Sequence, residues 1–351
     1  MGNDARQRLS LPSVILVITL LLSSCNQTMT SPSSTTTLPL SSRARIYLTQ
    51  APDIMQQHSV MRKKVDWTRL RQEAFAEAHH AQTPADTYPA ITHALQLLGD
   101  LHSFLHEPQS ATQAGSEVIP SVQEPFGQRL PDGIGYLNLP EFPPQYDGSG
   151  HAGKQYALLA QDIIRTTDPE KTCGWIVDLR NNSGGTLWPM LVGVGPILGE
   201  GVVGAFVSPD GSKLQLIYRN GQAFLDQKIQ LTIGSVYDLK QPLPPVAVLT
   251  NRSTGSSAEA ITVAFRGRPH TRSFGEPTAG VPTVNDGYRL SDGAILELTV
   301  AFDADRTGQT YDGPIPPDQE VPFARLSPPL ADDHVVQAAR TWLSTQGNWQ
   351  G

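Results

Sequence analysis

Hydrophobic positions near the start of the folded part of the chain follow a helical spacing. From about residue 44 to residue 105 they recur at steps of three and four, which is the repeat of one helix face. The positions are Ile54, Met55, Val60, Val65, Trp67, Leu70, Ala74, Phe75, Ile91, Leu95 and Leu98. We therefore predict a small helical bundle or cap over residues 44–110. Because Gly99 lies near the end of the last helix, we expect His102 at a junction between elements.

The pattern changes after a polar stretch rich in Pro, Gln, Ser and Gly, which predicts a loop over residues 111–132. Short apolar runs of strand length then alternate with segments of helical spacing. The predicted strands are 133–139, 174–179 and 246–249, and the predicted helices are 154–166, 187–198 and a segment that ends at Phe265. Strands that alternate with helices favour an α/β core with a largely parallel sheet, which we expect over residues 133–345.

Two of the strand-to-helix turns carry groups suited to catalysis. One turn holds Ser256 and Ser257 directly before a helix, where unpaired N–H groups and the helix dipole stabilise a forming alkoxide or oxyanion. The other ends in Gly184 and Gly185, whose N–H groups no side chain would cover. Right-handed crossovers put all such turns at the carboxyl edge of a parallel sheet. We therefore expect both turns to face one crevice.

Each turn also has a purely structural interpretation. Serines before a helix are most often N-caps, which accept hydrogen bonds from the first helical turn. A Gly-Gly pair is often no more than a tight turn. The two turns together favour a catalytic site more than either does alone.

Composition and charge exclude several classes of function. The chain has 351 residues, 39% hydrophobic and 17% charged, which is enough for one large or two moderate domains with a buried core. Its net charge of -7 and the lack of a basic run argue against nucleic acid as a partner. The sequence has no His-Glu-x-x-His or Cys-x-x-Cys pattern, so we expect neither a metal nor a cofactor. Only Cys25 and Cys173 are present, which excludes a disulfide framework; we expect Cys173 to be a small buried side chain.

The first residues have the pattern of an export signal. Arg6 and Arg8 precede an apolar stretch over residues 9–22 that is too short to span a membrane comfortably. The stretch ends in Leu22-Ser23-Ser24-Cys25, which resembles the lipobox of bacterial lipoproteins, where the cysteine is lipidated and becomes the mature N-terminus. We predict a lipoprotein signal peptide over residues 1–25, with Cys25 as the lipidation site. An ordinary secretory signal with a chance cysteine is the alternative.

Residues 26–43 are rich in Ser, Thr and Pro, which predicts a flexible tether. A lipidated cysteine followed by a tether predicts a protein held outside the cytoplasm on a bacterial membrane. Asn26 follows the cysteine in place of the aspartate associated with inner-membrane retention in enteric-type bacteria. In a Gram-negative host we therefore expect attachment to the outer membrane, facing the periplasm.

Four separated motifs resemble those of the tail-specific, or C-terminal processing, serine proteases, in the same order over roughly residues 65–343. They are Asp178-Leu179-Arg180-Asn181-Asn182-Ser183-Gly184-Gly185, Ser253-Thr254-Gly255-Ser256-Ser257-Ala258-Glu259, Gly275-Glu276-Pro277-Thr278-Ala279-Gly280 and Pro316-Pro317-Asp318. Four motifs in the right order are far less expected by chance than any one of them. The resemblance implies a crotonase/ClpP-like α/β core with Ser256 as the nucleophile and Gly184 and Gly185 as oxyanion donors.

The base distinguishes two branches of that family. Better-known members use a lysine about one helix and one strand after the serine, but Val281 stands near that position and the last lysine here is Lys240. Histidine is the usual alternative near neutral pH. In the branch that includes the nisin resistance protein and the tricorn protease core, the base is a histidine just before a serine at the end of the helical region. Asp100-Leu101-His102-Ser103-Phe104 matches that motif, as does Leu187-Trp188-Pro189-Met190 after the glycine turn, so the resemblance implies His102 as the base.

The sequence does not establish a third catalytic member. The tricorn branch uses a glutamate before the Pro-Asp motif, and residues 309–315 contain none. Asp312 could take that role, but we prefer a dyad without an acid. The other candidate histidines, His93, His106 and His270, are expected to be surface or packing residues. Glu259 and Glu276 are as readily explained as helix or loop stabilisers as they are as catalytic groups.

The resemblance therefore predicts a serine peptidase that forms an acyl-enzyme. An inactive peptide- or small-ligand-binding lipoprotein on the same fold, or an esterase or transacylase that uses the same serine, stays open. Too few residues separate His106 from Gly133 for the PDZ domain that many members carry. We therefore expect short peptides or locally unfolded proteins as substrates. Neither the natural substrate nor the oligomeric state follows from the sequence.

Overall fold

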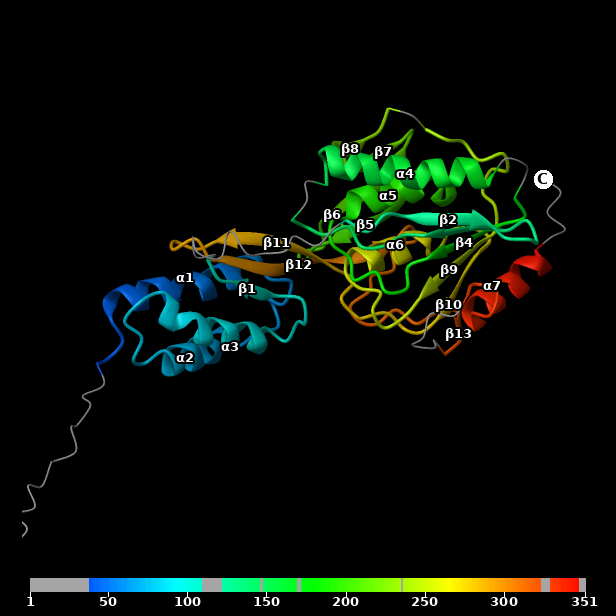
Figure 1. The fold of residues 1–351 in the computed structure, drawn as a ribbon. Helices are drawn as coiled ribbons and strands as arrows, with labels where there is room; N and C mark the ends of the chain where they lie inside the picture. The colour runs from blue at the N-terminus through cyan, green and yellow to red at the C-terminus, as the bar shows by residue number, and fades with distance from the viewer. Residues whose placement is uncertain are drawn as a thin grey trace, which may run out of the picture. The chain divides into compact units, whose positions relative to one another are not determined.

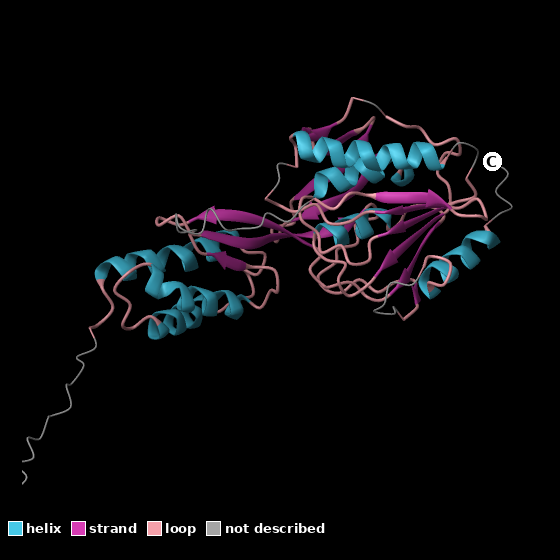
Figure 2. Cartoon of the chain, viewed as in Figure 1, coloured by secondary structure: helices cyan, strands magenta, loops and turns pink. Residues whose placement is uncertain are grey.

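The computed structural model of the protein describes residues 38–108, 122–145, 148–168, 172–234, 236–322 and 329–346. Within these ranges the chain forms a mixed α/β fold with two sheets (Figure 1). Figure 2 shows helices on both sides of one of these sheets. The predicted signal peptide over residues 1–25, its Cys25 and most of the predicted tether lie outside the described residues.

One sheet is largely parallel, as the sequence predicts. Its strand order is β13-β10-β9-β4-β3-β2, and only β2 runs antiparallel to its neighbour. The strands are β2 (Phe126–Arg129), β3 (Gly135–Asn138), β4 (Trp175–Asp178), β9 (Val246–Thr250), β10 (Thr271–Gly275) and β13 (Gln319–Glu320). Every residue of β4 and β9 is buried, as expected for central strands covered on both faces.

The second sheet is antiparallel and was not predicted from the sequence. Its strands are β1 (Phe104–His106), β5 (Gly201–Val207), β6 (Lys213–Arg219), β7 (Gln222–Leu225), β8 (Lys228–Thr232), β11 (Thr283–Arg289) and β12 (Ile295–Asp305). The long strand β12 pairs with β1, β5 and β11. It therefore links the helical N-terminal region to the α/β core.

The two faces of the parallel sheet are covered by different helices. The helices α4 (His151–Thr167), α5 (Leu187–Leu198) and α6 (Ser257–Phe265) share one hydrophobic core with Val177, Val248 and residues of β5 to β8. On the opposite face, Ile176 and Ala247 pack against α7 (His334–Thr345). Successive strand residues point to opposite faces, so a fully buried strand supplies both cores.

The helices of the N-terminal region pack against a hairpin from the C-terminal half of the chain as well as against one another. Its elements are α1 (Ser42–His58), α2 (Trp67–Glu77), a short 3-10 turn (Ala85–Thr87) and α3 (Tyr88–Leu98). Their apolar faces bury Leu290, Ala294, Leu296 and Leu298, which belong to the hairpin of β11 and β12. Tyr47 and Tyr88 also donate hydrogen bonds to Asp292 at the tip of that hairpin, at 2.7 and 2.5 Å.

Three details differ from the sequence-based expectation. The predicted cap over residues 44–110 is not wholly helical, since Phe104–His106 is a strand that pairs with β12. The predicted loop over residues 111–132 contains β2, which pairs with β3. Cys173 is exposed rather than buried. The strand β1 depends on β12, which is distant in the sequence, and a local pattern does not reveal such a partner.

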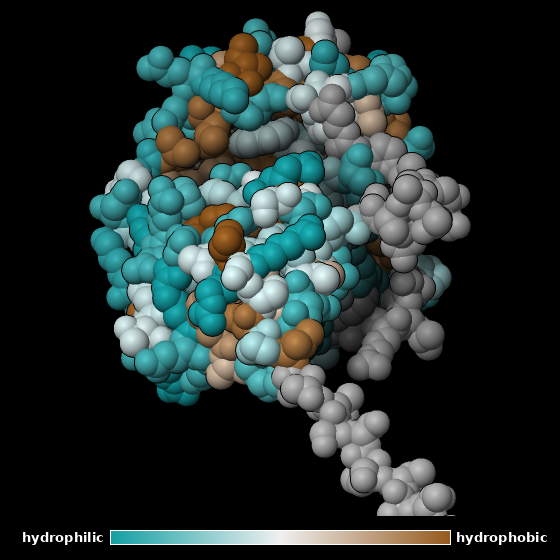
Figure 3. All heavy atoms as spheres, turned by 90° about the vertical axis from the view of Figure 1, so that its left-hand side faces the viewer, coloured by the Kyte–Doolittle hydropathy of each residue, from teal (hydrophilic) through white to brown (hydrophobic). Residues whose placement is uncertain are grey.

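Hydrophilic side chains cover most of the face seen in Figure 3, and the hydrophobic residues visible there form small separate groups. Scattered surface hydrophobic residues of this kind need no partner to explain them. None of the helices in the described parts of the chain is both long and apolar enough to span a bilayer.

Candidate active site

Ser256 lies between β9 and α6 in a backbone conformation that is unusual for a serine. Its φ is 52° and its ψ is -120°, whereas an ordinary N-cap residue has an extended backbone with negative φ. A positive φ at a residue other than glycine is strained, and such strain concentrates at functional sites. A nucleophile on a sharp strand-to-helix turn is a known example. Ser256 is the N-cap of α6 and forms a capping box with Glu259, and its positive φ is what differs from an ordinary N-cap.

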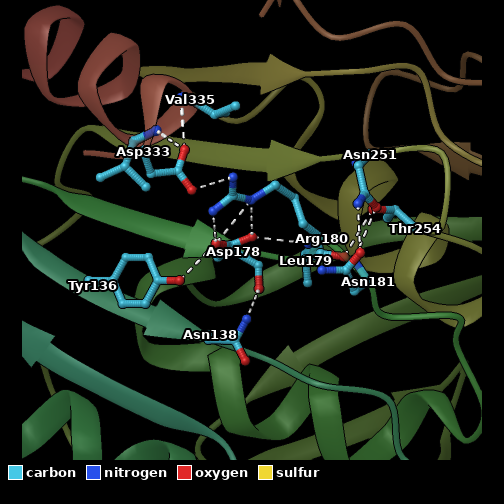
Figure 4. Close-up of polar contacts among 11 residues, drawn as sticks. Tyr136, Asn138, Asp178, Leu179, Arg180, Asn181, Asn251, Thr254, Asp333 and Val335 are labelled. Carbon is cyan, nitrogen blue, oxygen red and sulfur yellow. Dashed lines mark hydrogen bonds and ion pairs between the residues drawn. The ribbon is translucent and has the colours of Figure 1, made fainter. Parts of the chain in front are cut away.

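The serine turn and the glycine turn lie side by side at the carboxyl edge of the parallel sheet (Figure 4). Asn181 N–H donates to Asn251 Oδ1 at 3.0 Å, and Asn251 Nδ2 donates back to Asn181 Oδ1 at 2.8 Å. Thr254 Oγ1 donates to the Leu179 carbonyl at 2.9 Å. The expectation that both turns meet at one edge of the sheet is confirmed.

Gly184 lies directly against Ser256. A Cβ atom at Gly184 would stand 2.8 Å from Ser256 Cβ and 2.9 Å from Ser257 N, so a side chain at this position would collide with the serine turn. Gly184 N–H donates to Asn182 Oδ1 at 2.8 Å. Gly185 has φ of 89°, and its N–H has no partner among the described residues. The carbonyl of Gly185 accepts from Ser257 Oγ at 2.6 Å, which ties the two turns together again.

A buried ionic network supports the glycine turn, and sequence reasoning missed it. Arg180 contacts Asp178 at 2.6 Å and Asp333 at 2.8 Å, and all three side chains are buried (Figure 4). Tyr136 Oη donates to Asp178 at 2.7 Å, and burial, followed by the charge of Asp178, raises the pKa of Tyr136 far above its ordinary value. Asp333 also caps α7 by accepting from the N–H of Val335 at 2.9 Å. The network thus joins the end of β4 to the start of α7.

Glu259 connects Ser256 to the loop that follows β10. It is fully buried and accepts hydrogen bonds from Ser256 N at 2.8 Å and Val281 N at 3.0 Å. Its other oxygen accepts from Thr278 Oγ1 at 2.5 Å and from Gly280 N at 2.9 Å. Burial raises the pKa of Glu259, while these four donors oppose that rise. Glu259 therefore fixes the backbone on which Ser256 is carried.

His102 is held by residues of β11. Its Nδ1 lies 2.7 Å from Thr283 Oγ1, and its carbonyl accepts from Asn285 Nδ2 at 2.7 Å. Thr283 N–H in turn donates to the Val281 carbonyl at 2.8 Å, so the segment that contacts Glu259 runs directly into the one that contacts His102. Burial lowers the pKa of His102, and the charge of Asp100 opposes that change. Residues 278–285 therefore contact both His102 and Glu259, and Glu259 accepts from Ser256 N–H.

Other residues singled out from the sequence lie in different surroundings. Asp312 is exposed and makes no contact with His102 among the described residues. His93 is paired with Glu77 on α2 at 2.6 Å, and His106 lies on the exposed face of β1. His270 precedes β10 with φ of 53°.

Sequence reasoning missed Thr283, Asn285 and Asp303 at the site. Asp303 is 3% exposed, and its Oδ2 has no hydrogen-bond partner in the described parts of the chain. Burial, followed by the nearby charge of Glu259, raises the pKa of Asp303 to about 8. No group of three or more His, Cys, Asp or Glu side chains in the described ranges is arranged to hold a metal ion.

Comparison with known proteins gives a consistent match. The family model described as Peptidase family S41 matches residues 133–321. The nisin-resistance protein of Lactococcus lactis subsp. lactis is 30% identical over 264 residues, which make up 75% of this chain and 78% of that protein. The carboxy-terminal processing protease CtpA of Bacillus subtilis is 26% identical over 185 residues, which make up 53% of this chain and 34% of that protein.

Solved structures show the same fold. A lipoprotein from Streptococcus agalactiae superposes with a TM-score of 0.68 at 24% identity, covering 88% of this chain and 99% of that one. The photosystem II D1 C-terminal processing protease gives a TM-score of 0.56 at 16% identity, covering 80% of this chain and 93% of that one. The predicted fold class, an α/β core preceded by a helical region, is confirmed.

Proposed function

The chain belongs to peptidase family S41, and from that premise we propose that Ser256 and His102 form a catalytic dyad that hydrolyses peptide bonds outside the cytoplasm. The family supports a serine-type peptidase, which is a hydrolase. The observation that carries the proposal is the strained Ser256 backbone beside Gly184 and Gly185, linked through Glu259 to the segment that contacts His102. A structural N-cap requires neither the positive φ of Ser256 nor its contact with Gly184, whereas the Glu259 bond to Ser256 N–H is the capping box of α6.

In this mechanism His102 accepts the hydroxyl proton of Ser256, and the oxygen forms a bond to the substrate carbonyl carbon. The imidazolium then gives the proton to the leaving amine as the C–N bond breaks. Water, deprotonated by the same imidazole, releases the acyl group and restores Ser256. No acidic third member is required, and we retain Asp312 only as an alternative.

We assign the oxyanion site to backbone N–H groups of the two adjoining turns. Gly185 N–H has no partner among the described residues, and the N–H of Ser257 begins α6 beside Gly184. Gly184 N–H donates to Asn182 Oδ1. Gly184 would therefore contribute in one of two ways. Its missing side chain lets the glycine turn approach Ser256, or its N–H leaves Asn182 and binds the substrate oxygen. Donors fixed before the reaction stabilise the charge that develops on the carbonyl oxygen.

Labelling with an active-site serine probe, such as a fluorophosphonate, tests this function on the purified protein. We expect labelling of the wild type, none of Ser256→Ala, and peptide cleavage by the wild type alone. An inactive binding protein would bind peptide without labelling. An esterase or transacylase would be labelled but would leave peptides intact. Ser253→Ala, which removes a neighbouring hydroxyl, is the matched control and should keep both labelling and cleavage.

We propose short peptides or locally unfolded proteins as the substrates. The relative from Lactococcus lactis is named for resistance to nisin, which makes nisin a suitable first peptide to assay. Cleavage of nisin by the wild type and not by Ser256→Ala would identify one substrate. Equal digestion by both proteins would point to a contaminating protease.

We also propose that Cys25 carries a lipid that anchors the protein outside the cytoplasm. The support is the lipobox-like sequence before Cys25 and the Ser/Thr/Pro-rich stretch after it. Cys25→Ala should release the protein from the membrane fraction into the soluble extracytoplasmic fraction. Unchanged membrane association of Cys25→Ala would contradict the lipid anchor without affecting the proposed chemistry.

A further inference from the structure

We propose that Thr283 is the positioning residue of this site, and that its hydroxyl fixes the His102 imidazole in the tautomer that leaves Nε2 free to act as the base. The inference rests on the proposed Ser256–His102 dyad. In Ser-His-Asp triads a carboxylate holds this position. Here a neutral hydroxyl would take it, which changes the pH at which the base works.

The contact is short and lies at the start of a paired strand. Thr283 Oγ1 lies 2.7 Å from His102 Nδ1, and Thr283 is the first residue of β11. β12 pairs with β11 from Thr283 opposite Phe302 to Arg289 opposite Ile295, with a register shift between Val284 and Asn285. A second bond, from Asn285 Nδ2 to the His102 carbonyl, holds the histidine backbone to the same strand. Ring and backbone are therefore both fixed relative to β11.

Among the described residues, no carboxylate forms a hydrogen bond or ion pair with the ring of His102. Asp100 accepts from the backbone N–H of His102 at 3.1 Å and from that of Ser103 at 2.8 Å, so it holds the loop rather than the ring. Glu259 accepts four hydrogen bonds from the serine turn and the following loop. Asp303 is buried beside Glu259. Among the described residues, Asp100 is the charged group that acts on the pKa of His102, and burial outweighs it.

The direction of the hydrogen bond between His102 Nδ1 and Thr283 Oγ1 decides whether Nε2 can act as a base. A neutral imidazole carries one N–H, and the hydrogen bond made by one nitrogen sets the state of the other. If Nδ1–H donates to Thr283 Oγ1, Nε2 keeps its lone pair and can accept a proton from Ser256. If the hydroxyl donated to Nδ1 instead, Nε2 would carry the hydrogen and could not act as a base.

The Val281 carbonyl, 3.5 Å from Thr283 Oγ1, is farther away than in an ordinary O–H···O hydrogen bond. We assign the form in which Thr283 accepts from Nδ1–H because only that form leaves Nε2 able to act as the base. A neutral acceptor cannot offset the charge of the imidazolium as a carboxylate does. The base is therefore weaker than in a triad and stays deprotonated at lower pH.

Three substitutions of Thr283 test the proposal with one peptide substrate. Thr283→Val keeps the shape but removes the hydroxyl, and we expect kcat to fall about tenfold to a hundredfold with little change in KM, as for other partners that orient a histidine. Thr283→Ser restores the hydroxyl and should recover most of the activity. Thr283→Asp supplies a carboxylate, which should move the acidic limb of the kcat profile to higher pH. Thr310→Val, at an exposed threonine, is the matched control.

A direct readout does not depend on turnover. In the Ser256→Ala protein, nitrogen NMR of the His102 ring should show the hydrogen on Nδ1 above the pKa of the imidazole. A hydrogen on Nε2 would overturn the proposal, and so would a Thr283→Asp profile that coincides with that of the wild type. If Thr283→Val does not fold, the ring NMR and the pH profile of Thr283→Asp still test the proposal. If His102→Ala or Ser256→Ala keeps wild-type turnover, the proposed dyad itself fails, which is a separate outcome.

Discussion

The acid–base behaviour of His102 follows from where its ring lies. Burial disfavours the charged imidazolium and lowers the pKa of His102 below its ordinary value of 6.5, while Asp100 opposes this effect. As the proposed base, His102 must be neutral, so activity should be lost as the pH falls through this lowered pKa. The hydroxyl of Thr283, unlike a carboxylate, does not raise that pKa through its charge.

We therefore predict that the acidic limb of kcat against pH has its midpoint below about 6.5, the ordinary value for histidine. The measurement is turnover of one peptide between acidic and neutral pH, with the folded fraction checked by circular dichroism at each pH. His102→Ala should lower kcat by a factor of at least about a thousand, in the range seen when a triad member is removed. Near-normal turnover by His102→Ala would exclude this base.

Asp303 is the residue whose ionisation should oppose stability most clearly. Its pKa is raised from 3.8 to about 8, because it is buried and lies near the charge of Glu259. The folded protein thus holds a proton that the unfolded chain has lost above pH 4. The stability that this proton contributes is fully present below about pH 4 and is lost as the pH rises toward about 8.

We predict that Asp303→Asn, which stays neutral, raises the melting temperature relative to wild type at pH 8 and has little effect at pH 4. The difference in unfolding free energy should be on the order of a few kcal/mol at pH 8, since each unit of pKa shift corresponds to about 1.4 kcal/mol. Melting curves of both proteins across this range measure it. A difference that does not change with pH would contradict the assignment.

At the scale of elements, the ionic network of Arg180 holds the glycine turn to α7. Arg180 is buried between Asp178 and Asp333, so its removal would leave two carboxylates without a countercharge. Breaking a buried pair in this way costs far more than its net contribution to stability, because the remaining charge stays desolvated.

We predict that Arg180→Met destabilises the protein by about 3–5 kcal/mol, the range for an uncompensated buried charge. Replacing Asp178 and Asp333 by Asn in the same protein should recover part of the loss, since no unpaired charge then remains. Arg340→Met is the control, because Arg340 forms a partly exposed pair with Asp132. Denaturant titration gives the three free energies. Equal effects of Arg180→Met and Arg340→Met would show that burial of the network is not what matters.

The elements that could be predicted from the sequence are those with a local signal. The helix over residues 187–198 and the strands before the two special turns coincide closely with α5, β4 and β9, because their apolar runs are continuous and bounded by glycine or polar residues. The strands β5 to β8 were missed, since half-exposed antiparallel strands have a weaker pattern. β1 was missed because its three residues are ordered by β12, almost two hundred positions later.

The site residues also divide into those with a local sequence signal and those without one. Ser256 and the glycine pair lie in turns with strong local motifs, and His102 was found through a family resemblance. Thr283, Asn285 and Asp303 carry no local signal, since a threonine or asparagine at a strand start is common in any fold. Their role follows from contacts between segments that lie far apart in the sequence, such as His102 and Thr283.

For the whole molecule, the hairpin of β11 and β12 is shared between the helical region and the site. Leu296 and Leu298 on β12 are buried among the helices α1 to α3, whereas Thr283 and Asn285 at the other end of the hairpin contact His102. His102 itself follows α3 directly. Packing of the helical region should therefore determine how well the base is placed.

We predict that Leu296→Ala lowers kcat as well as stability. The lost packing and the cavity should cost about 2–5 kcal/mol, and a looser hairpin should misplace His102 relative to Ser256, where an error of about 1 Å can cost a hundredfold in rate. Leu231→Ala is the matched control, because Leu231 on β8 is equally buried but belongs to the main core. Both proteins are assayed well below their melting temperatures, with kcat and KM determined separately. If the two variants lose the same stability and the same activity, the helical region acts on the site only through global stability, and the hairpin has no special role in placing the base.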